Sequence, residues 1–169
     1  VRQAPGRQAA VEDAGDLLQV LQSVPLGMPH NGPISSRFGN RSNPFTGKGS
    51  EFHGGLDLKG STGQPIRVTA KGKVHFAGVQ SGYGNVVMVD HAHGYSTVYA
   101  HLSKISVKAG QHVEAGSVIG QLGSTGRSTG PHLHYEVQSK GQRIDPEQFL
   151  SLNAPVRKQL EKPASEAVP

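Results

Sequence analysis

The segment NVVMVDHAHGYSTVYAHL (residues 85–102) contains two strand-like runs separated by a short turn. Residues 85–91 and 95–102 are rich in valine or tyrosine, and apolar and polar side chains partly alternate along both runs. The connecting residues include a glycine, which favours a tight turn. Because strands with so short a connection pair antiparallel, this stretch predicts two neighbouring antiparallel strands.

Segments of the same kind occur on both sides of this one. Residues 71–79, 117–123 and 132–138 are also short and β-prone, and glycine-containing turns separate them. The 23 glycines and 11 prolines of this 169-residue chain favour many tight turns over a helical bundle. We therefore predict an all-β fold, a compact antiparallel β sandwich or barrel-sandwich hybrid with short flanking helices.

The two flanking helices are predicted from separate signals. Residues 11–24 place acidic residues before leucines and a valine at helical spacing, which predicts a short amphipathic helix. Near the other end of the β-rich region, Asp145 is a suitable N-cap residue and Pro146 a suitable first helical residue. One helical turn is therefore expected within residues 144–150.

Differences in composition divide the chain into three regions. Residues 1–29 are assigned to a leader with a short helix and a linker, residues 30–150 to the β-rich domain, and residues 151–169 to a tail. The tail has too few apolar side chains to fold, so we expect partial disorder there. Since the chain begins at Val1 rather than at methionine, we also expect that it is part of a longer protein, which leaves room for a targeting or anchoring segment upstream.

Charge and cysteine content narrow the classes of partner and metal site. The formal net charge of +5 suits a polyanionic partner, including a cell wall with free carboxylates. Aromatic residues make up only 5% and form no basic-aromatic pattern, so we expect no nucleic-acid partner. The chain has no cysteine, which leaves histidine and carboxylate side chains as metal ligands. It also has no apolar run long enough to span a bilayer.

The motif HLHYE (132–136) places two histidines two residues apart. On a strand, His132 and His134 share one face and lie about 6.6 Å apart at the backbone, so both imidazoles can reach one small site. Glu136 continues the same face. The alternative for the pair alone is two polar side chains that face solvent.

The motif FHGGLDL (52–58) is a second candidate for metal ligands. His53 and Asp57 are four residues apart, and the even spacing keeps both side chains on one side of an extended segment. The two glycines between them permit a bulge or a close approach. Histidine and aspartate together suit Zn²⁺. The alternative is a glycine-rich turn capped by the aspartate.

Three protein ligands and an open position are typical of catalytic zinc. His53, Asp57 and one of the 132/134 histidines would form such a set. The other histidine would then lie beside the metal with His101, which alternates with Tyr99 on the strand of residues 95–102. A zinc ion acidifies water and polarises a carbonyl oxygen, so this set predicts a hydrolytic site. A second His-x-His at 91 and 93 falls in a turn, where we expect a solvated loop.

Three motifs together resemble one known family. H-G-G-L-D (53–57), Y-A-H-L (99–102) and G-P-H-L-H-Y-E-V (130–137) are similar in order, spacing and residue type to the lysostaphin-like, or LytM-type, zinc metallopeptidases. The resemblance covers roughly residues 30–150. It implies an antiparallel β sandwich with a long substrate groove over the sheet.

The resemblance also implies a role for each candidate residue. His53, Asp57 and His134 would bind one Zn²⁺ per chain. His101 and His132 would be the catalytic histidines that orient or deprotonate water and stabilise the tetrahedral intermediate. All five positions carry the expected residue types, which argues against a degenerate, inactive member.

Family members cleave peptide cross-links or stems of bacterial peptidoglycan. The segment PFTGKGSEFHGGLDL (44–58) resembles the Gram-negative periplasmic branch, which implies the D-alanyl–meso-diaminopimelate bond, a periplasmic or cell-envelope location and an anchor in the inner membrane. The loop GSTGRSTG (123–130) would form one groove wall, where Arg127, Ser128 and Thr129 are expected to bind stem-peptide carboxylates. A regulatory protein partner is a further expectation.

Three alternatives stay open. The chain could be an auto-inhibited or non-catalytic member of the family, which binds peptidoglycan or activates an amidase. A phosphotransferase carrier domain also uses paired histidines, but it has no need of His53 and Asp57. A plain interaction sandwich with incidental histidines would bind no stoichiometric zinc.

Overall fold

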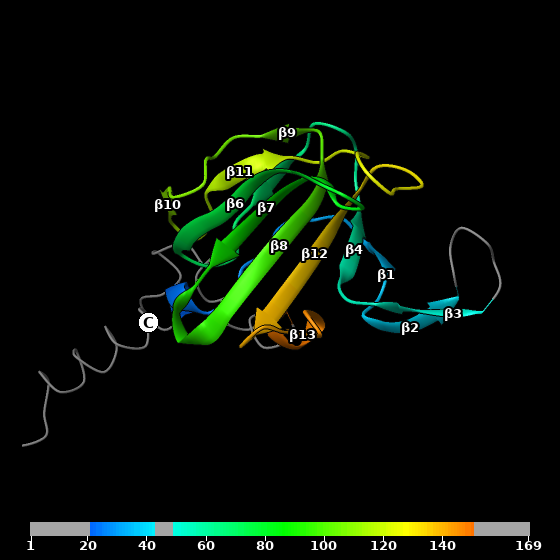
Figure 1. Cartoon of the computed structure of the whole chain (residues 1–169), viewed down its shortest axis with the longest axis horizontal. Coiled ribbons are helices and arrows are strands. Elements are labelled where there is room, and N and C mark those ends of the chain that lie inside the picture. Colours follow the sequence, from blue (N-terminus) through cyan, green and yellow to red (C-terminus); the bar gives the residue numbers. More distant parts are fainter. Residues whose placement is uncertain (1–20, 43–48, 151–169) are drawn as a thin grey trace, which may run out of the picture.

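The computed structural model describes residues 21–42 and 49–150, and in this part of the chain the strands form three antiparallel sheets (Figure 1). The largest sheet has eight strands. Along the sheet they are β1 (Ile34–Ser36), β4 (Leu56–Lys59), β12 (His132–Ser139), β8 (Tyr95–Leu102), β7 (Gly84–Asp90), β6 (Gly72–Gln80) and β10 (His112–Val113), with β13 (Gln142–Ile144) paired to β12.

Two smaller sheets complete the architecture. A three-stranded sheet is formed, in this order, by β5 (Pro65–Arg67), β11 (Val118–Gln121) and β9 (Lys104–Ile105). A two-stranded ribbon of β2 (Gly39–Ser42) and β3 (Ser50–His53) projects from the end of the large sheet next to β4 (Figure 1). A 3-10 turn, η1 (Ala92–Gly94), links β7 to β8. The predicted all-β, antiparallel fold is thus confirmed.

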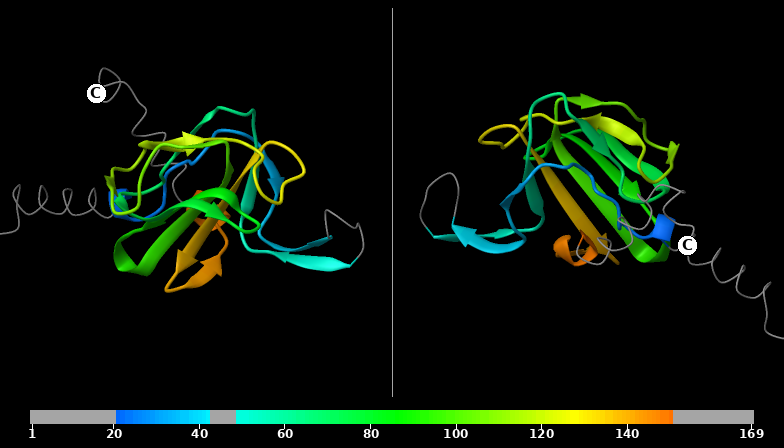
Figure 2. Two further views of the ribbon diagram at one scale, coloured as in Figure 1. Left: turned by 45° about the horizontal axis from the view of Figure 1, so that its top comes forward. Right: turned by 180° about the vertical axis from the view of Figure 1, so that it is seen from behind.

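The main core lies between the large sheet and the three-stranded sheet. Leu58 on β4 and Tyr135 on β12 belong to the same buried cluster as Ile66 on β5 and Ile119 on β11. Burial of each such side chain contributes about 1.5–3 kcal/mol to folding. The segment that begins at residue 21 is coloured blue in Figure 2. In the right-hand view, which shows the molecule from behind, this segment runs across the front.

Alternation along β12 separates the core from the opposite face of the large sheet. Leu133 and Tyr135 belong to the core cluster, so their neighbours His132, His134 and Glu136 point to the other face. A second, smaller cluster of Val86, Val98 and Ala100 covers part of that face. The paired histidines therefore lie on the side of the sheet that faces away from the main core, as the i, i+2 spacing predicts.

A chain of hydrogen bonds links the half-buried His91 to the core. Its Nδ1–H donates to the backbone carbonyl of Lys71 at 2.8 Å, and its Nε2 lies 2.8 Å from Thr97 Oγ1. Thr97 Oγ1 in turn lies 2.8 Å from the hydroxyl of Tyr99, which is completely buried. The expectation of a solvated loop is therefore wrong for His91, whereas His93 is exposed. The two side chains have different environments because the 3-10 turn directs only the first one inward.

We expect the substitution His91→Ala to destabilise the fold. It removes the two hydrogen bonds that His91 makes, with the Lys71 carbonyl and with the Thr97 hydroxyl, which costs about 1–3 kcal/mol. A lower Tm in thermal unfolding would show this. The exposed pair of His75 and Asp90 provides the control, because His75→Ala removes only a surface contact and should change stability by less than about 1 kcal/mol. An unchanged Tm in His91→Ala would contradict the structural role.

The same histidine predicts a pH dependence of stability. Burial lowers the pKa of His91 below its ordinary value of 6.5. A depressed pKa means that the unfolded chain binds the proton more tightly, so the contribution is complete above pH 6.5 and is lost as pH falls through the folded-state pKa. The loss of Tm on acidification should therefore be smaller in His91→Ala than in the wild type. Equal losses would show that His91 is not the group responsible.

The flanking helices are described only in part. Residues 21–23 are helical, while the rest of the helix expected at 11–24 lies outside the described residues, as do most of the leader and the whole tail. Residues 147–150 form the expected helical turn, and the Asp145 carboxylate accepts the backbone N–H of Glu147 at 3.0 Å. In the described part of the chain, no helix has the length and apolar character needed to cross a membrane.

Candidate metal centre and active site

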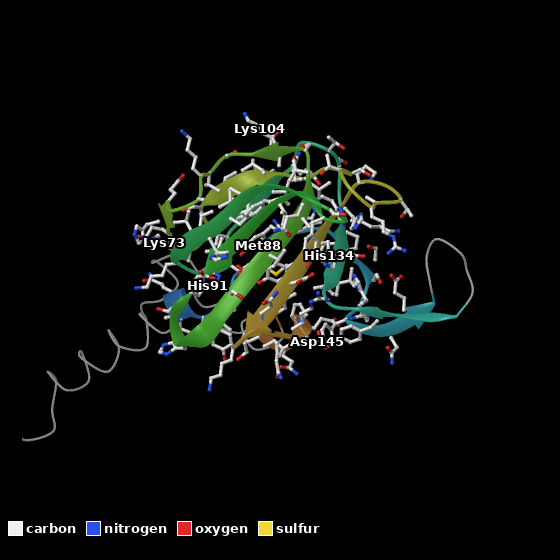
Figure 3. The ribbon with its side chains drawn as sticks, in the orientation of Figure 1. Lys73, Met88, His91, Lys104, His134 and Asp145 are labelled. Carbon is white, nitrogen blue, oxygen red and sulfur yellow. The ribbon has the colours of Figure 1, made fainter. Side chains whose placement is uncertain are left out.

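Three side chains from three strands bring one donor atom each to a common point. His53 Nε2 lies 3.2 Å from Asp57 Oδ1 and 3.3 Å from His134 Nδ1. His134 Nδ1 lies 2.9 Å from the same carboxylate oxygen. Among the described residues, this trio is the group of histidine and carboxylate side chains arranged to hold a metal ion. Figure 3 labels His134, where β12 passes β4.

Hydrogen bonds on the far side of each imidazole fix which nitrogen carries the proton. His53 Nδ1 lies 2.9 Å from the backbone carbonyl of Arg37, which can only accept, so Nδ1 is protonated and Nε2 keeps its lone pair. His134 Nε2 lies 2.8 Å from Glu136 Oε2, so in the neutral ring Nε2 donates and Nδ1 keeps its lone pair. Two lone pairs and a carboxylate oxygen therefore converge, and only a cation or a proton makes that arrangement favourable.

The donor spacing fits zinc. Ligands at about 2.0–2.1 Å from a tetrahedral Zn²⁺ lie roughly 3.3 Å from one another. The three separations here are 2.9, 3.2 and 3.3 Å. Two neutral imidazoles and one carboxylate also match the donor set of catalytic zinc sites, which leave a fourth position open. His53, Asp57 and His134 are thus suited to hold this ion.

The charges in the cluster favour a cation. Burial alone would raise the pKa of Asp57, but hydrogen bonds and charge from His134 and His53 outweigh burial and hold that pKa well below its usual range. Burial alone would lower the pKa of His134, but hydrogen bonds with Asp57 and Glu136 raise it to about 9. The two carboxylates that stabilise a proton on His134 stabilise a divalent cation for the same electrostatic reason.

The two glycines of the HGGLD motif connect two different sheets. His53 ends β3 in the projecting ribbon, and Asp57 lies on β4 in the large sheet, so they are not on one continuous strand. A Cβ on Gly55 would lie 2.6 Å from the carbonyl oxygen of Tyr135. The close approach expected of the glycines is therefore present, and it lets β3 turn back to place His53 over β4.

Two further imidazoles flank the trio. His132 Nδ1 lies 2.8 Å from the carbonyl of Gly130, and its Nε2 lies 3.8 Å from Asp57 Oδ1. His101 Nδ1 lies 2.7 Å from the carbonyl of Thr125. Because both carbonyls accept from Nδ1–H, each neutral ring keeps its lone pair on Nε2. The rings of His101 and His132 lie 4.8 Å apart between centroids.

A bulge in β8 brings His101 to this face. In a regular strand His101 would share the core face with Tyr99, but three residue steps on β8, from Tyr99 to Leu102, oppose two on β7. His101 has a φ of 64°, a left-handed conformation that costs a non-glycine residue about 1 kcal/mol or more. The extra residue redirects the imidazole, and burial then lowers the pKa of His101 to about 4, with further lowering by the charges of His132 and His134.

The cluster lies in a pocket of about 300 Å³. Arg127, Ser128 and Thr129 line it, so the loop that contains them forms a wall as expected. Arg127 is also held by Glu51 on the opposite ribbon, with 3.3 Å between Nη1 and Oε1. Phe52 lines the pocket and is 55% exposed, which is unusual for so large an apolar side chain. The loop and the β3 ribbon thus line the pocket from two sides, and Phe52 gives it one apolar wall.

Sequence reasoning placed Glu136 on the right face but gave it no role. Its side chain is 2% exposed, and it accepts hydrogen bonds from His134 and from the Tyr83 hydroxyl, the latter at 2.6 Å. Burial alone would raise the pKa of Glu136, but these hydrogen bonds outweigh burial and lower that pKa. A buried carboxylate behind a ligand imidazole orients the ring and increases its basicity. The position of Glu136, two residues after His134 on the same strand face, could have indicated this role. Nothing in the local sequence indicated that Tyr83 would bind Glu136.

We expect Glu136→Gln to weaken zinc binding by about 10-fold or more. The amide keeps the size of the side chain but loses the charge that supports His134, and losing such a partner typically costs 10–100-fold in metal affinity. Competition with a chelating dye measures the change. Tyr83→Phe is the matched control, because it removes one hydrogen bond to Glu136 and keeps the carboxylate, so its effect should be smaller. Equal affinity in Glu136→Gln and wild type would exclude this role.

The comparisons with known proteins agree with the motifs. A model of peptidase family M23 matches residues 51–146. The DD-carboxypeptidase/endopeptidase Mpg of Neisseria meningitidis is 47% identical over 131 residues, which cover 78% of this chain and 30% of that protein. The peptidoglycan DD-endopeptidase ShyA of Vibrio cholerae is 39% identical over 150 residues, which cover 88% of this chain and 34% of that protein.

The fold comparison gives the same result. The crystal structure of a zinc containing peptidase from Vibrio cholerae is 40% identical, with a TM-score of 0.63 over 68% of this chain and 35% of that one. This chain spans about a third of the length of the two curated relatives. The family model covers more than half of the 169 residues and includes all three motifs. The chain therefore belongs to peptidase family M23, the lysostaphin-like family.

Proposed function

We propose that this chain is a zinc-dependent endopeptidase that hydrolyses peptide cross-links of bacterial peptidoglycan during cell-wall remodelling, with the D-alanyl–meso-diaminopimelate bond as its target. The observation that carries the proposal is the trio of donors 2.9–3.3 Å apart with the imidazoles of His101 and His132 beside it. The DD-endopeptidase names of two relatives support the substrate class. The domain responsible comprises residues 30–150.

The residues of the site divide into three roles. His53, Asp57 and His134 hold Zn²⁺, and Glu136 orients His134 from behind. When bound, Zn²⁺ supplies a Lewis acid that polarises the scissile carbonyl and makes water more acidic. Glu136 keeps the Nδ1 lone pair of His134 directed at the metal position, because its oxygen accepts the Nε2 proton at 2.8 Å.

His101 and His132 move protons. Each neutral ring has a lone pair on Nε2 and an Nδ1–H tied to a backbone carbonyl, so each can accept a proton without rotating. One accepts the proton of the attacking water at Nε2 and delivers it to the leaving amine. The other ring takes a proton from solvent at Nε2 before the attack, and this N–H then donates a hydrogen bond to the oxyanion of the tetrahedral intermediate. The pKa of about 4 keeps His101 neutral at physiological pH, as a proton acceptor must be.

A location in the Gram-negative cell envelope follows from this substrate. Relatives named as peptidoglycan endopeptidases and an outer membrane antigenic lipoprotein from Haemophilus influenzae support that location. An upstream anchor in the inner membrane and a regulatory protein partner belong to the same proposal. The alternative is an auto-inhibited or non-catalytic member that binds peptidoglycan or activates an amidase.

Digestion of purified, cross-linked Gram-negative sacculi tests the proposal. The digest is run with and without chelator, and the muropeptides are identified by chromatography and mass spectrometry. Conversion of dimers to monomers that chelator blocks and zinc restores would support the endopeptidase and identify the bond. No cleavage by protein with one bound zinc would favour the regulatory alternative. No cleavage and no zinc binding would contradict both the ligand set and the activity.

A further inference from the structure

Two arginines line the pocket, Arg127 and Arg143, and Arg143 has no role in the proposed mechanism. Arg143 lies on β13, which pairs with β12 beside the site. Its side chain is 49% exposed, and its recorded polar contact joins Nε to Glu136 Oε1 at 3.6 Å, beyond ordinary hydrogen-bond distance. Within the described residues, its two terminal nitrogens make no hydrogen bond. The planar end of the guanidinium is thus available to a ligand.

Glu136 forms its hydrogen bonds with residues other than Arg143, so the terminal nitrogens of Arg143 stay available. Its Oε2 accepts from both His134 and Tyr83, at 2.8 and 2.6 Å. Its Oε1 lies 3.4 Å from the amide nitrogen of Gln138. Arg143 therefore contributes charge near this buried carboxylate without forming the two parallel hydrogen bonds that a guanidinium makes with a free carboxylate.

The other pocket arginine is in a different situation. Arg127 is bound to Glu51 across the pocket and makes a bridge between the loop and the β3 ribbon. A ligand carboxylate would compete with Glu51 for this guanidinium. Of the two arginines that line this pocket, Arg143 is therefore better placed to bind an anionic ligand, although charge and position in the sequence favoured Arg127.

Gly54 places the Arg143 side chain next to the metal ligands. A Cβ at Gly54 would lie 2.5 Å from Arg143 Nη1 and 2.6 Å from its Cδ. The guanidinium thus lies directly on the backbone of the residue that follows His53. An anion bound there would belong to the part of a substrate that flanks the scissile bond.

We infer that Arg143 binds a free carboxylate of the substrate immediately beside the bond that is cut. The inference rests on the proposed function and makes it more specific. In a D-alanyl–meso-diaminopimelate cross-link, the carbon that carries the leaving amine also carries a free carboxylate. Two terminal nitrogens of a guanidinium match the two oxygens of that group. Arg143 therefore selects cross-links with this carboxylate over those in which it is amidated.

Two cross-linked peptide substrates that differ in one group test the inference. One carries the free carboxylate beside the leaving amine, and the other carries a carboxamide there. We expect Arg143→Gln to lower the ratio of kcat/KM for the free over the amidated substrate by about 10-fold, the lower range for a charged hydrogen bond at a half-exposed site. Arg143→Lys keeps the charge but not the paired geometry, and should retain part of the ratio.

The controls separate recognition from a purely structural role. If Arg143 only balanced the charge of Glu136, Arg143→Gln would lower kcat/KM for both substrates equally, and the unchanged ratio would overturn the inference. Arg127→Gln should leave the ratio unchanged, and a loss of the ratio there would assign the carboxylate to Arg127 instead. Thermal unfolding of each variant shows that it is folded.

A binding measurement makes the comparison independent of turnover. Calorimetry with the two corresponding cleavage products, one with the free carboxylate and one amidated, should show a preference for the free carboxylate in the wild type and none in Arg143→Gln. Hydrolysis of neither substrate by zinc-loaded wild type would contradict the proposed function. The same preference in wild type and variant would contradict the inference alone.

Discussion

Asp57→Ala is expected to lower zinc affinity by more than about 100-fold and to abolish peptide hydrolysis. Loss of a partner behind a metal ligand already costs 10–100-fold, and here the ligand itself is lost. The variant leaves the two imidazole nitrogens, 3.3 Å apart, without the carboxylate that lies 2.9 and 3.2 Å from them. Metal content after dialysis against a weak chelator and the sacculus digest measure the two effects.

Asp90→Ala is the matched control for this experiment. Asp90 is also an aspartate paired with a histidine, but it and His75 are 60% and 66% exposed and lie outside the trio. Its replacement should change neither zinc content nor activity. His134→Ala should behave as Asp57→Ala does. If Asp57→Ala retained stoichiometric zinc with wild-type affinity, Asp57 would not be a ligand and the geometric argument for the trio would fail.

His101→Ala is expected to keep its zinc and to lose about 10²–10⁴-fold in kcat. This is the range for removing a positioned acid or base. Zinc content stays because His101 is not one of the three residues whose donor atoms converge, and its own Nδ1 faces the Thr125 carbonyl. Steady-state kinetics on a cross-linked peptide, with metal analysis of the same sample, measures both quantities. His132→Ala should give a loss in the same range.

His93→Ala provides the comparison for His101→Ala. Both histidines have a left-handed φ, 61° for His93 and 64° for His101, so both substitutions place alanine in the same strained conformation. His93 is exposed and has no place in the site. A loss of kcat confined to His101→Ala would therefore reflect the imidazole and not the backbone. Full activity with full zinc in both His101→Ala and His132→Ala would refute the proton-transfer role.

Local sequence was sufficient where a simple period governs the structure. Alternation along HLHYEV separates apolar residues on one face from histidines on the other, and β12 keeps that alternation through its pairing with β4 and β8. The same local reasoning found the glycines of HGGLD, because only glycine permits the close approach that the backbone makes there. The helical turn after Asp145 was predicted from its cap for a similar local reason.

Local periodicity was not sufficient where distant segments decide the outcome. His101 was assigned to the site from the other candidate segments, whereas alternation alone would place it beside Tyr99 in the core; an extra residue in β8 relative to β7 directs it to the site. His91 was expected in solvent, but the 3-10 turn and the Lys71 carbonyl hold it inward. Arg127 lines the pocket as expected, and its pairing with Glu51 of the ribbon is a long-range contact that no local pattern indicated.

The all-β fold, the face on which the paired histidines lie and the residue types suited to zinc can be predicted from local patterns, because they depend on a strand period of two and on ligand chemistry. How these residues act together depends on long-range contacts. Pairing of strands far apart in the chain places three donors 2.9–3.3 Å apart, and carbonyls and a carboxylate from other segments determine which nitrogen of each imidazole is free. Proton positions and charge pairs depend on such long-range contacts, and no local pattern of residues encodes them.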